Sequence, residues 1–159
     1  MSLILYHGSF LAVDKPNISF SRNNLDFGKG FYATPIKSQA HNWASRFIRK
    51  QGQGVVSAYE FNENTTNAKI LTFETYSKEW LSFIISCRQG NTKGNYDIII
   101  GGIANDKVFD TIQLFLDGLV DEAVALKRLQ YDKPNIQYCF RNQHIINECL
   151  TYTGSETVT

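Results

Sequence analysis

Short apolar segments with strand-like and helix-like periodicity are interleaved along the whole chain, and this irregular alternation is what most constrains the fold. Strand patterns cover residues 3–7, 55–61, 68–73, 96–102 and 135–140, and helix patterns cover residues 36–50, 78–87, 108–116 and 121–129. The strands are short, and several of them meet through turns rather than through regular helical crossovers. We therefore predict an α+β fold whose sheet is split or largely antiparallel and is flanked by helices.

The length of the chain predicts a single domain. A chain of 159 residues with 43% apolar residues can bury one ordinary core. We assign residues 1–150 to this domain and expect residues 151–159 to be a polar, frayed C-terminal tail. The net charge of +1 gives no global electrostatic reason to expect binding to nucleic acid or to an anionic membrane.

The sequence also predicts a cytoplasmic protein that does not contact membranes. Residues 1–9 lack the basic start and long apolar run of a signal peptide, and no apolar run reaches about 18 residues. The cysteines Cys87, Cys139 and Cys149 have the spacing of neither a zinc site nor a disulfide framework. We expect them to be reduced, mostly buried thiols, and we expect no metal.

Three segments carry side chains suited to binding a small molecule. His7 ends the first strand and precedes Gly8, where a ligand can approach the backbone closely. Tyr32 follows the glycine-hinged segment 27–31, and Trp43 lies about three helical turns further on. Gln137 alternates with the apolar residues of the last predicted strand, so we expect it to face a cleft or solvent.

Each of these features also has an ordinary structural interpretation. A histidine at a strand end is often satisfied by local backbone, and glycines between aromatic residues often form a turn in the core. Trp43 can be a core residue on a helix face, and Gln137 can simply be exposed. Asn105 and Asp106 have normal turn chemistry, so we expect a structural role for them and for Asp97.

Taken together and in order, the three segments resemble the His-Tyr-Glu class of ADP-ribosyltransferases, the diphtheria-toxin-like and poly(ADP-ribose)-polymerase-like group. The sequence Tyr-His-Gly-Ser at residues 6–9 resembles the first strand of that class, and Phe-Gly-Lys-Gly-Phe-Tyr-Ala at residues 27–33 resembles its tyrosine block. Residues 135–138 resemble its third strand, in which Gln137 replaces the usual glutamate. Residues 97–101, 104–106 and 116–119 also resemble a family of small uncharacterised bacterial proteins in this superfamily, in which glutamine is common at that position.

The resemblance implies an ADP-ribosyltransferase-like fold and an enzyme that uses NAD⁺ as co-substrate without a metal. His7, Tyr32 and Gln137 would be the catalytic residues, converging within about 10 Å on one cleft. His7 would anchor the ribose, the Gly8 backbone would bind the carboxamide, and Tyr32 and Trp43 would clamp the nicotinamide ring. The resemblance places Phe31 and Ala33 beside Tyr32 in the binding segment, and Ser9 or Arg22 near the adenine side.

Gln137 departs from the usual pattern because it carries no charge. Without the charge-assisted bond that a glutamate makes, the enzyme would lose about 1–3 kcal/mol of transition-state stabilisation. We therefore expect Gln137→Glu to retain or raise NAD⁺ hydrolysis. We therefore expect mono-ADP-ribosyl transfer to an acceptor that the sequence does not identify. The alternatives are a non-catalytic module that binds NAD⁺ or ADP-ribose and a domain whose partner masks the cleft. Similar small bacterial toxins are held by a cognate antitoxin, so such a protein partner is also expected.

Overall fold

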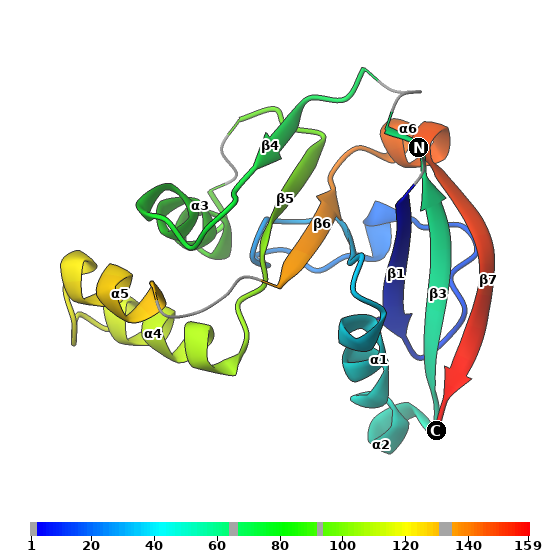
Figure 1. Ribbon diagram of the computed structural model, residues 1–159, viewed down its shortest axis with the longest axis horizontal. Helices are drawn as coiled ribbons and strands as arrows, with labels where there is room; N and C mark the ends of the chain where they lie inside the picture. Colours follow the sequence, from blue (N-terminus) through cyan, green and yellow to red (C-terminus); the bar gives the residue numbers. More distant parts are fainter. Residues whose placement is uncertain (1–2, 64–66, 92–93, 131–134) are drawn as a thin grey trace.

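The computed structural model describes residues 3–63, 67–91, 94–130 and 135–159 (Figure 1). The strands are β1 (Leu3–Ser9), β2 (Phe31–Ala33), β3 (Gly54–Phe61), β4 (Ile70–Thr72), β5 (Ile98–Gly102), β6 (Ile136–Phe140) and β7 (Leu150–Val158). The helices are η1 (Ile18–Phe20), α1 (Lys37–Ser45), α2 (Ile48–Gln51), α3 (Lys78–Arg88), α4 (Asp106–Leu116), α5 (Glu122–Leu129) and α6 (Gln143–Cys149). This architecture confirms the predicted α+β fold.

The strands form two sheets that meet at one bridge. The first sheet has the order β1-β3-β7, and the second has the order β2-β6-β5-β4. All neighbouring pairs are antiparallel except β4 and β5, which are parallel. The backbones of Tyr6 in β1 and Thr34 after β2 exchange two hydrogen bonds, of 2.8 and 2.9 Å. This bridge brings the first sheet against β2 and therefore positions His7 beside Tyr32.

Helix α1 packs closely against β1 and β3 because glycines leave room for its backbone. A Cβ atom added at Gly8 would lie 2.7 Å from the Ala44 nitrogen, and one added at Gly54 would lie 2.7 Å from the Ala44 carbonyl carbon. Ala40 and Ala44 are fully buried on the facing side of α1. The glycine after His7 therefore has a packing role, whatever it contributes to ligand binding.

Helices α3, α4 and α5 lie together beside the second sheet, on the side away from β1, β3 and β7 (Figure 1). Trp80 and Ile84 of α3 are fully buried in a core cluster that also contains Phe27 and Ile99. Side-chain caps begin these helices: Ser77, Asn105 and Asp121 accept from the backbone of the residue three positions later. Every helix in the described ranges is too short or too polar to cross a bilayer.

The predicted helix over residues 36–50 is wrong in one respect, because it is broken into α1 and α2. The Arg46 and Phe47 amides bond to carbonyls three residues back instead of four, which tightens the end of α1. Gly52 then ends α2 in the left-handed conformation, with φ of 83°.

The prediction of a frayed tail at residues 151–159 is also wrong. Residues 151–158 belong to β7, which pairs with β3 from Gly54↔Val158 to Phe61↔Leu150. Helix α6, which the sequence analysis missed, leads into β7, and Asn142 caps it by accepting from the His144 amide at 2.9 Å. The polar side chains of β7 face outward while its backbone completes the first sheet.

Candidate active site

His7 is tied to Tyr32 through the main chain. Its Nδ1 lies 2.6 Å from the Tyr32 carbonyl oxygen, and its ring lies against that of Phe31 at a centroid distance of 4.5 Å and an angle of 31°. The bond is possible because the bridge between Tyr6 of β1 and Thr34, just after β2, brings the two segments together. His7 is therefore held from two sides.

This contact also determines what the other ring nitrogen can do. A carbonyl oxygen only accepts, so Nδ1 carries the proton and Nε2 of the neutral ring is left as an acceptor. Burial lowers the pKa of His7 below its usual value of 6.5, although the bond to Tyr32 opposes this shift. At neutral pH the ring is thus uncharged and can accept a hydrogen bond from a hydroxyl group.

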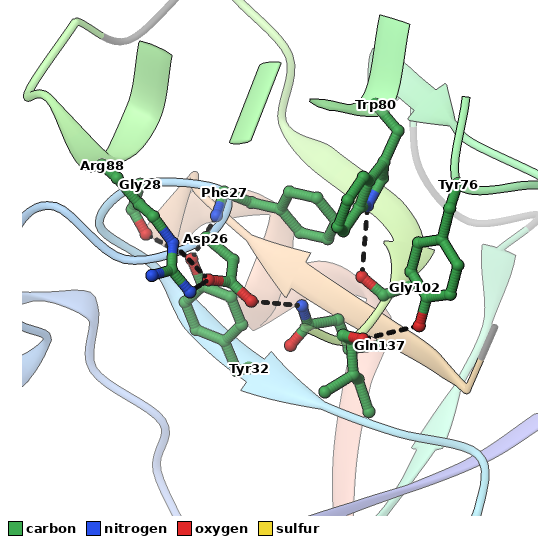
Figure 2. Close-up of polar contacts among 10 residues, drawn as sticks. Asp26, Phe27, Gly28, Tyr32, Tyr76, Trp80, Arg88, Gly102 and Gln137 are labelled. Carbon is green, nitrogen blue, oxygen red and sulfur yellow. Dashed lines mark hydrogen bonds and ion pairs between the residues drawn. The ribbon is translucent and has the colours of Figure 1, made fainter. Parts of the chain in front are cut away.

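Tyr32 holds the turn that precedes its own strand. Its hydroxyl donates to the Gly28 carbonyl at 2.5 Å and accepts from the Phe27 amide at 3.0 Å (Figure 2). Phe27 is fully buried, so this turn is anchored in the core. Burial raises the pKa of Tyr32 well above its usual value of 10.0, with a further contribution from Cys139. The phenol is therefore protonated and occupied in the fold, which leaves the ring as the part that a ligand can contact.

Gln137 is buried, with 4% of its surface exposed, so of the two expected surroundings, a cleft or solvent, solvent is wrong. Its Nε2 lies 3.5 Å from Oδ2 of Asp26, and Arg88 donates to Oδ1 of Asp26 from Nε at 3.0 Å and from Nη2 at 2.5 Å (Figure 2). Because a carboxylate only accepts, the amide NH₂ faces Asp26 and the amide oxygen points elsewhere. This chain of contacts fixes the orientation of the Gln137 amide.

The strand register places Tyr32 and Gln137 on the same face of the second sheet. Tyr32 in β2 pairs with Cys139 in β6, and Gln137 lies two residues before Cys139 on the same side of β6. His7 joins this pair through the Tyr32 carbonyl. The three predicted catalytic residues are thus linked by adjacent strands. Five surface cavities of the described residues are lined by other side chains, and none of the three lines any of these five.

Gly8 presents its backbone at the edge of β1 that β3 does not use. Tyr6 directs both its N–H and its C=O away from β3 to Thr34, and alternation gives Gly8 the same direction. Within the described ranges, no hydrogen bond to either Gly8 group is found outside the ladder. The Gly8 N–H and C=O therefore offer a donor and an acceptor beside His7, the two partners that the carboxamide of a ligand needs.

The other predicted binding residues have different surroundings. Phe31 and Ala33 are buried, at 6% and 0% exposure, in a core cluster with residues of both sheets. Their side chains therefore pack in the interior next to Tyr32. Trp43 is half-buried on α1, with its Cβ close to Gly8. Ser9 is half-buried at the end of β1, and Arg22 is exposed. No ring contact between Tyr32 and Trp43 is found among the described residues, so the nicotinamide clamp stays a prediction.

Asp97 and Asn105 have the structural roles expected of them. The Asp97 carboxylate accepts from the Lys69 amide at 2.8 Å and from Asn142 Nδ2 at 3.0 Å. Asn105 caps α4 by accepting from the Val108 amide at 2.9 Å. The Asp106 side chain lies outside the described part of the chain.

Sequence reasoning missed Asp26 and Arg88. These residues are 62 positions apart, and an isolated Asp before Phe27 or an isolated Arg at the end of α3 carries no signal of its own. Their side chains are only 17% and 21% exposed, which marks them as part of the site rather than of the surface. Among the described residues, no group of three His, Cys, Asp or Glu side chains could hold a metal ion.

The thiols are expected to be inert in the folded protein. Cys87, Cys139 and Cys149 are free and buried, and burial raises the pKa of both Cys139 and Cys149 to about 12. Iodoacetamide at about pH 7–8 should therefore label the native protein at least about tenfold more slowly than the urea-unfolded protein, as measured by mass spectrometry. Rapid labelling of native Cys139 would instead indicate a reactive thiol beside Tyr32.

Comparison with known proteins identifies the family of this chain. A family model described as "Protein of unknown function (DUF3990)" matches residues 3–152. No curated protein and no solved structure gives a significant match. The match covers almost the whole chain, from the start of β1 to the third residue of β7. The chain therefore belongs to the DUF3990 family.

Proposed function

We propose that this protein binds NAD⁺ and transfers its ADP-ribose to an acceptor, as a mono-ADP-ribosyltransferase. One observation carries the proposal: His7 is bonded to the Tyr32 carbonyl, and Tyr32 shares one sheet face with Gln137. Residues separated by more than a hundred positions are thus brought together in the order that the resemblance to the His-Tyr-Glu class requires. The free Gly8 edge supports the same conclusion, because it offers both partners of a carboxamide.

The proposed mechanism assigns a separate task to each group. The Gly8 N–H and C=O bind the nicotinamide carboxamide, and the Tyr32 ring packs against the nicotinamide. His7 Nε2 accepts from a ribose hydroxyl, because its other nitrogen already donates to Tyr32. The bond between the nicotinamide nitrogen and the ribose C1′ breaks, and its electron pair leaves with neutral nicotinamide. An acceptor nucleophile then bonds to C1′ and loses its proton.

Gln137 orients the ribose in this scheme. The NH₂ group of Gln137 donates to Asp26, so the amide oxygen of Gln137 is left to accept from the ribose 2′-hydroxyl. With Gln137 only 4% exposed, this contact requires side chains that cover it to move when NAD⁺ binds. The same burial favours one alternative, a module that binds NAD⁺ or ADP-ribose without turnover. A cognate antitoxin remains a prediction from the resemblance.

Release of nicotinamide separates these two functions. We expect the wild-type protein to release nicotinamide from labelled NAD⁺, and His7→Ala to lower the rate by about ten- to a hundredfold, because it removes one positioned hydrogen bond. His41→Ala is the matched control, since His41 is exposed on α1 and should leave the rate unchanged. Circular dichroism should confirm that both variants fold.

The outcomes discriminate between the proposals. Calorimetric binding of NAD⁺ without nicotinamide release would replace the transferase by the binding module. A wild-type protein that neither binds NAD⁺ nor releases nicotinamide would overturn both.

A further inference from the structure

Arg141 is a charged side chain that the site described above does not use. It follows β6, its backbone N–H donates to the Asp97 carbonyl at 2.7 Å, and strand alternation directs its side chain to the face that also carries Cys139. Burial raises the pKa of Cys139 to about 12, while the positive charge of Arg141 acts in the opposite direction. Arg141 as a whole is half-buried, so part of its side chain lies in the interior and part remains accessible.

One nitrogen of this guanidinium has no hydrogen-bond partner among the described residues. Nη1 of Arg141 is buried without a hydrogen bond, and no ion pair of Arg141 with another described residue is found. Arg88 is the contrasting case, since Asp26 takes two of its N–H donors. A buried cationic donor without an acceptor is costly, so an acceptor is expected to complete it.

A cavity of about 390 Å³ is lined by Ile18, Ser19, Lys29 and Arg141. Two cations and a hydroxyl line it, and none of its lining residues is acidic. Arg141 also lines a second cavity of about 400 Å³, but Asp97 lines that cavity too, which disfavours an anion there. The charge pattern thus selects the first cavity for a negatively charged ligand.

We propose that the cavity lined by Ser19, Lys29 and Arg141 binds the phosphate group of a small molecule. The flat guanidinium fork can donate two parallel bonds to phosphate oxygens, and the flexible Lys29 ammonium can supply a second charge from the exposed rim. A phosphate there would also give Arg141 an anionic partner, which no described residue supplies.

The phosphate can come from two sources. Arg141 lies four residues after Gln137, or about 13 Å along an extended strand. At that separation the cavity could hold the pyrophosphate of NAD⁺, an assignment that rests on the proposed function. A separate phosphorylated ligand has the same chemistry and does not depend on that function.

Pyrophosphate itself tests the site. Calorimetry and thermal unfolding in phosphate-free buffer, at ionic strength matched with chloride, should show binding and a raised Tm for the wild type. Arg141→Gln should weaken binding by about tenfold or more and abolish the Tm shift, because the cationic guanidinium fork is lost. Arg49→Gln is the charge-matched control, since Arg49 is exposed on α2 and should leave binding unchanged. Lys29→Gln should weaken binding severalfold and, because Lys29 is exposed, tests the site without disturbing the core.

The proposal is overturned if millimolar pyrophosphate changes neither the calorimetric signal nor the Tm of the wild type. It is also overturned if Arg141→Gln and Lys29→Gln both bind pyrophosphate as the wild type does.

Competition between pyrophosphate and NAD⁺ then identifies the source of the phosphate. Mutual exclusion with NAD⁺, together with weaker NAD⁺ binding by Arg141→Gln, assigns the phosphate to NAD⁺. Simultaneous binding, or pyrophosphate binding by a protein that does not bind NAD⁺, assigns it to a separate ligand, so failure of the proposed function leaves this site testable.

Discussion

Gln137→Glu is expected to destabilise the fold and to lower NAD⁺ turnover instead of raising it. The sequence alone predicts that turnover is retained or raised, because a carboxylate would face the positive charge that develops on the ribose. The buried contact with Asp26 reverses this expectation, since Gln137 Nε2 and Asp26 Oδ2 are 3.5 Å apart. A second carboxylate in that place would repel the first, and Arg88 can neutralise only one of them. We expect a loss of about 2–3 kcal/mol in the free energy of unfolding near neutral pH.

The loss of stability in Gln137→Glu should depend on pH. Burial and the neighbouring carboxylate should raise the pKa of the introduced carboxyl group in the folded state above its unfolded value of about 4.3. The folded state then binds the proton more tightly, so the loss of stability is absent below the unfolded pKa and grows as pH rises towards the folded pKa. Urea unfolding at about pH 5 and about pH 8 should show the larger loss at the higher pH.

Two further variants make this result specific. Asp26→Asn in the Gln137→Glu background should recover most of the stability, because one carboxylate then remains beside Arg88. Gln51→Glu is the matched control, since Gln51 is exposed at the end of α2 and should change stability little at either pH. A Gln137→Glu protein that is as stable as the wild type at both pH values would show that Asp26 does not hold the amide. In that case the orientation assigned to Gln137 fails, while His7 and Tyr32 are unaffected.

The parts of the site that sequence could predict are those with local signals. His7 and Tyr32 lie beside glycines in short, recognisable segments, and the strands that carry them pair as expected of a split sheet. The Asp26–Arg88 pair has no such signal, because it depends on how the turn before β2 packs against the end of α3. The burial of Gln137 was missed for the same reason. Alternation indicates which face a residue points to, and it cannot show that both faces of β6 are covered.

The errors in the fold have a similar physical origin. The C-terminal residues that form β7 carry hydroxyl groups at alternate positions, 151, 153, 155 and 157. This weak pattern gains its structure only from pairing with β3. The break between α1 and α2 comes from tightened backbone bonds within an otherwise helical pattern. Gly8 was interpreted as a site for ligand approach, and its contact with α1 could not be anticipated because α1 begins 29 positions later.

Gly8→Ala and Gly54→Ala are each expected to reduce the free energy of unfolding by about 3 kcal/mol. At both positions the added methyl group would meet the α1 backbone at Ala44 at 2.7 Å, and backbone cannot rotate away as a side chain can. The helix must therefore shift away from β1 and β3, and the buried contacts of Ala40 weaken with it. Gly52→Ala is the control, because it has φ of 83° but no atom near the new methyl group, so it should lose only about 1–2 kcal/mol.

The two glycines should nevertheless differ in NAD⁺ binding, and this difference tests the role of the β1 edge. Gly54 contacts the same helix but lies on β3, whereas Gly8 directs its own N–H and C=O towards the proposed carboxamide site. At a temperature where both variants are fully folded, we expect Gly8→Ala to weaken NAD⁺ binding by about tenfold through displacement of that edge, and Gly54→Ala to weaken it by less than about threefold. Calorimetry compares the NAD⁺ affinities of two variants that are expected to lose the same free energy of unfolding. Equal affinities would mean that Gly8 is retained only for packing against α1, and the carboxamide would then have to be bound elsewhere.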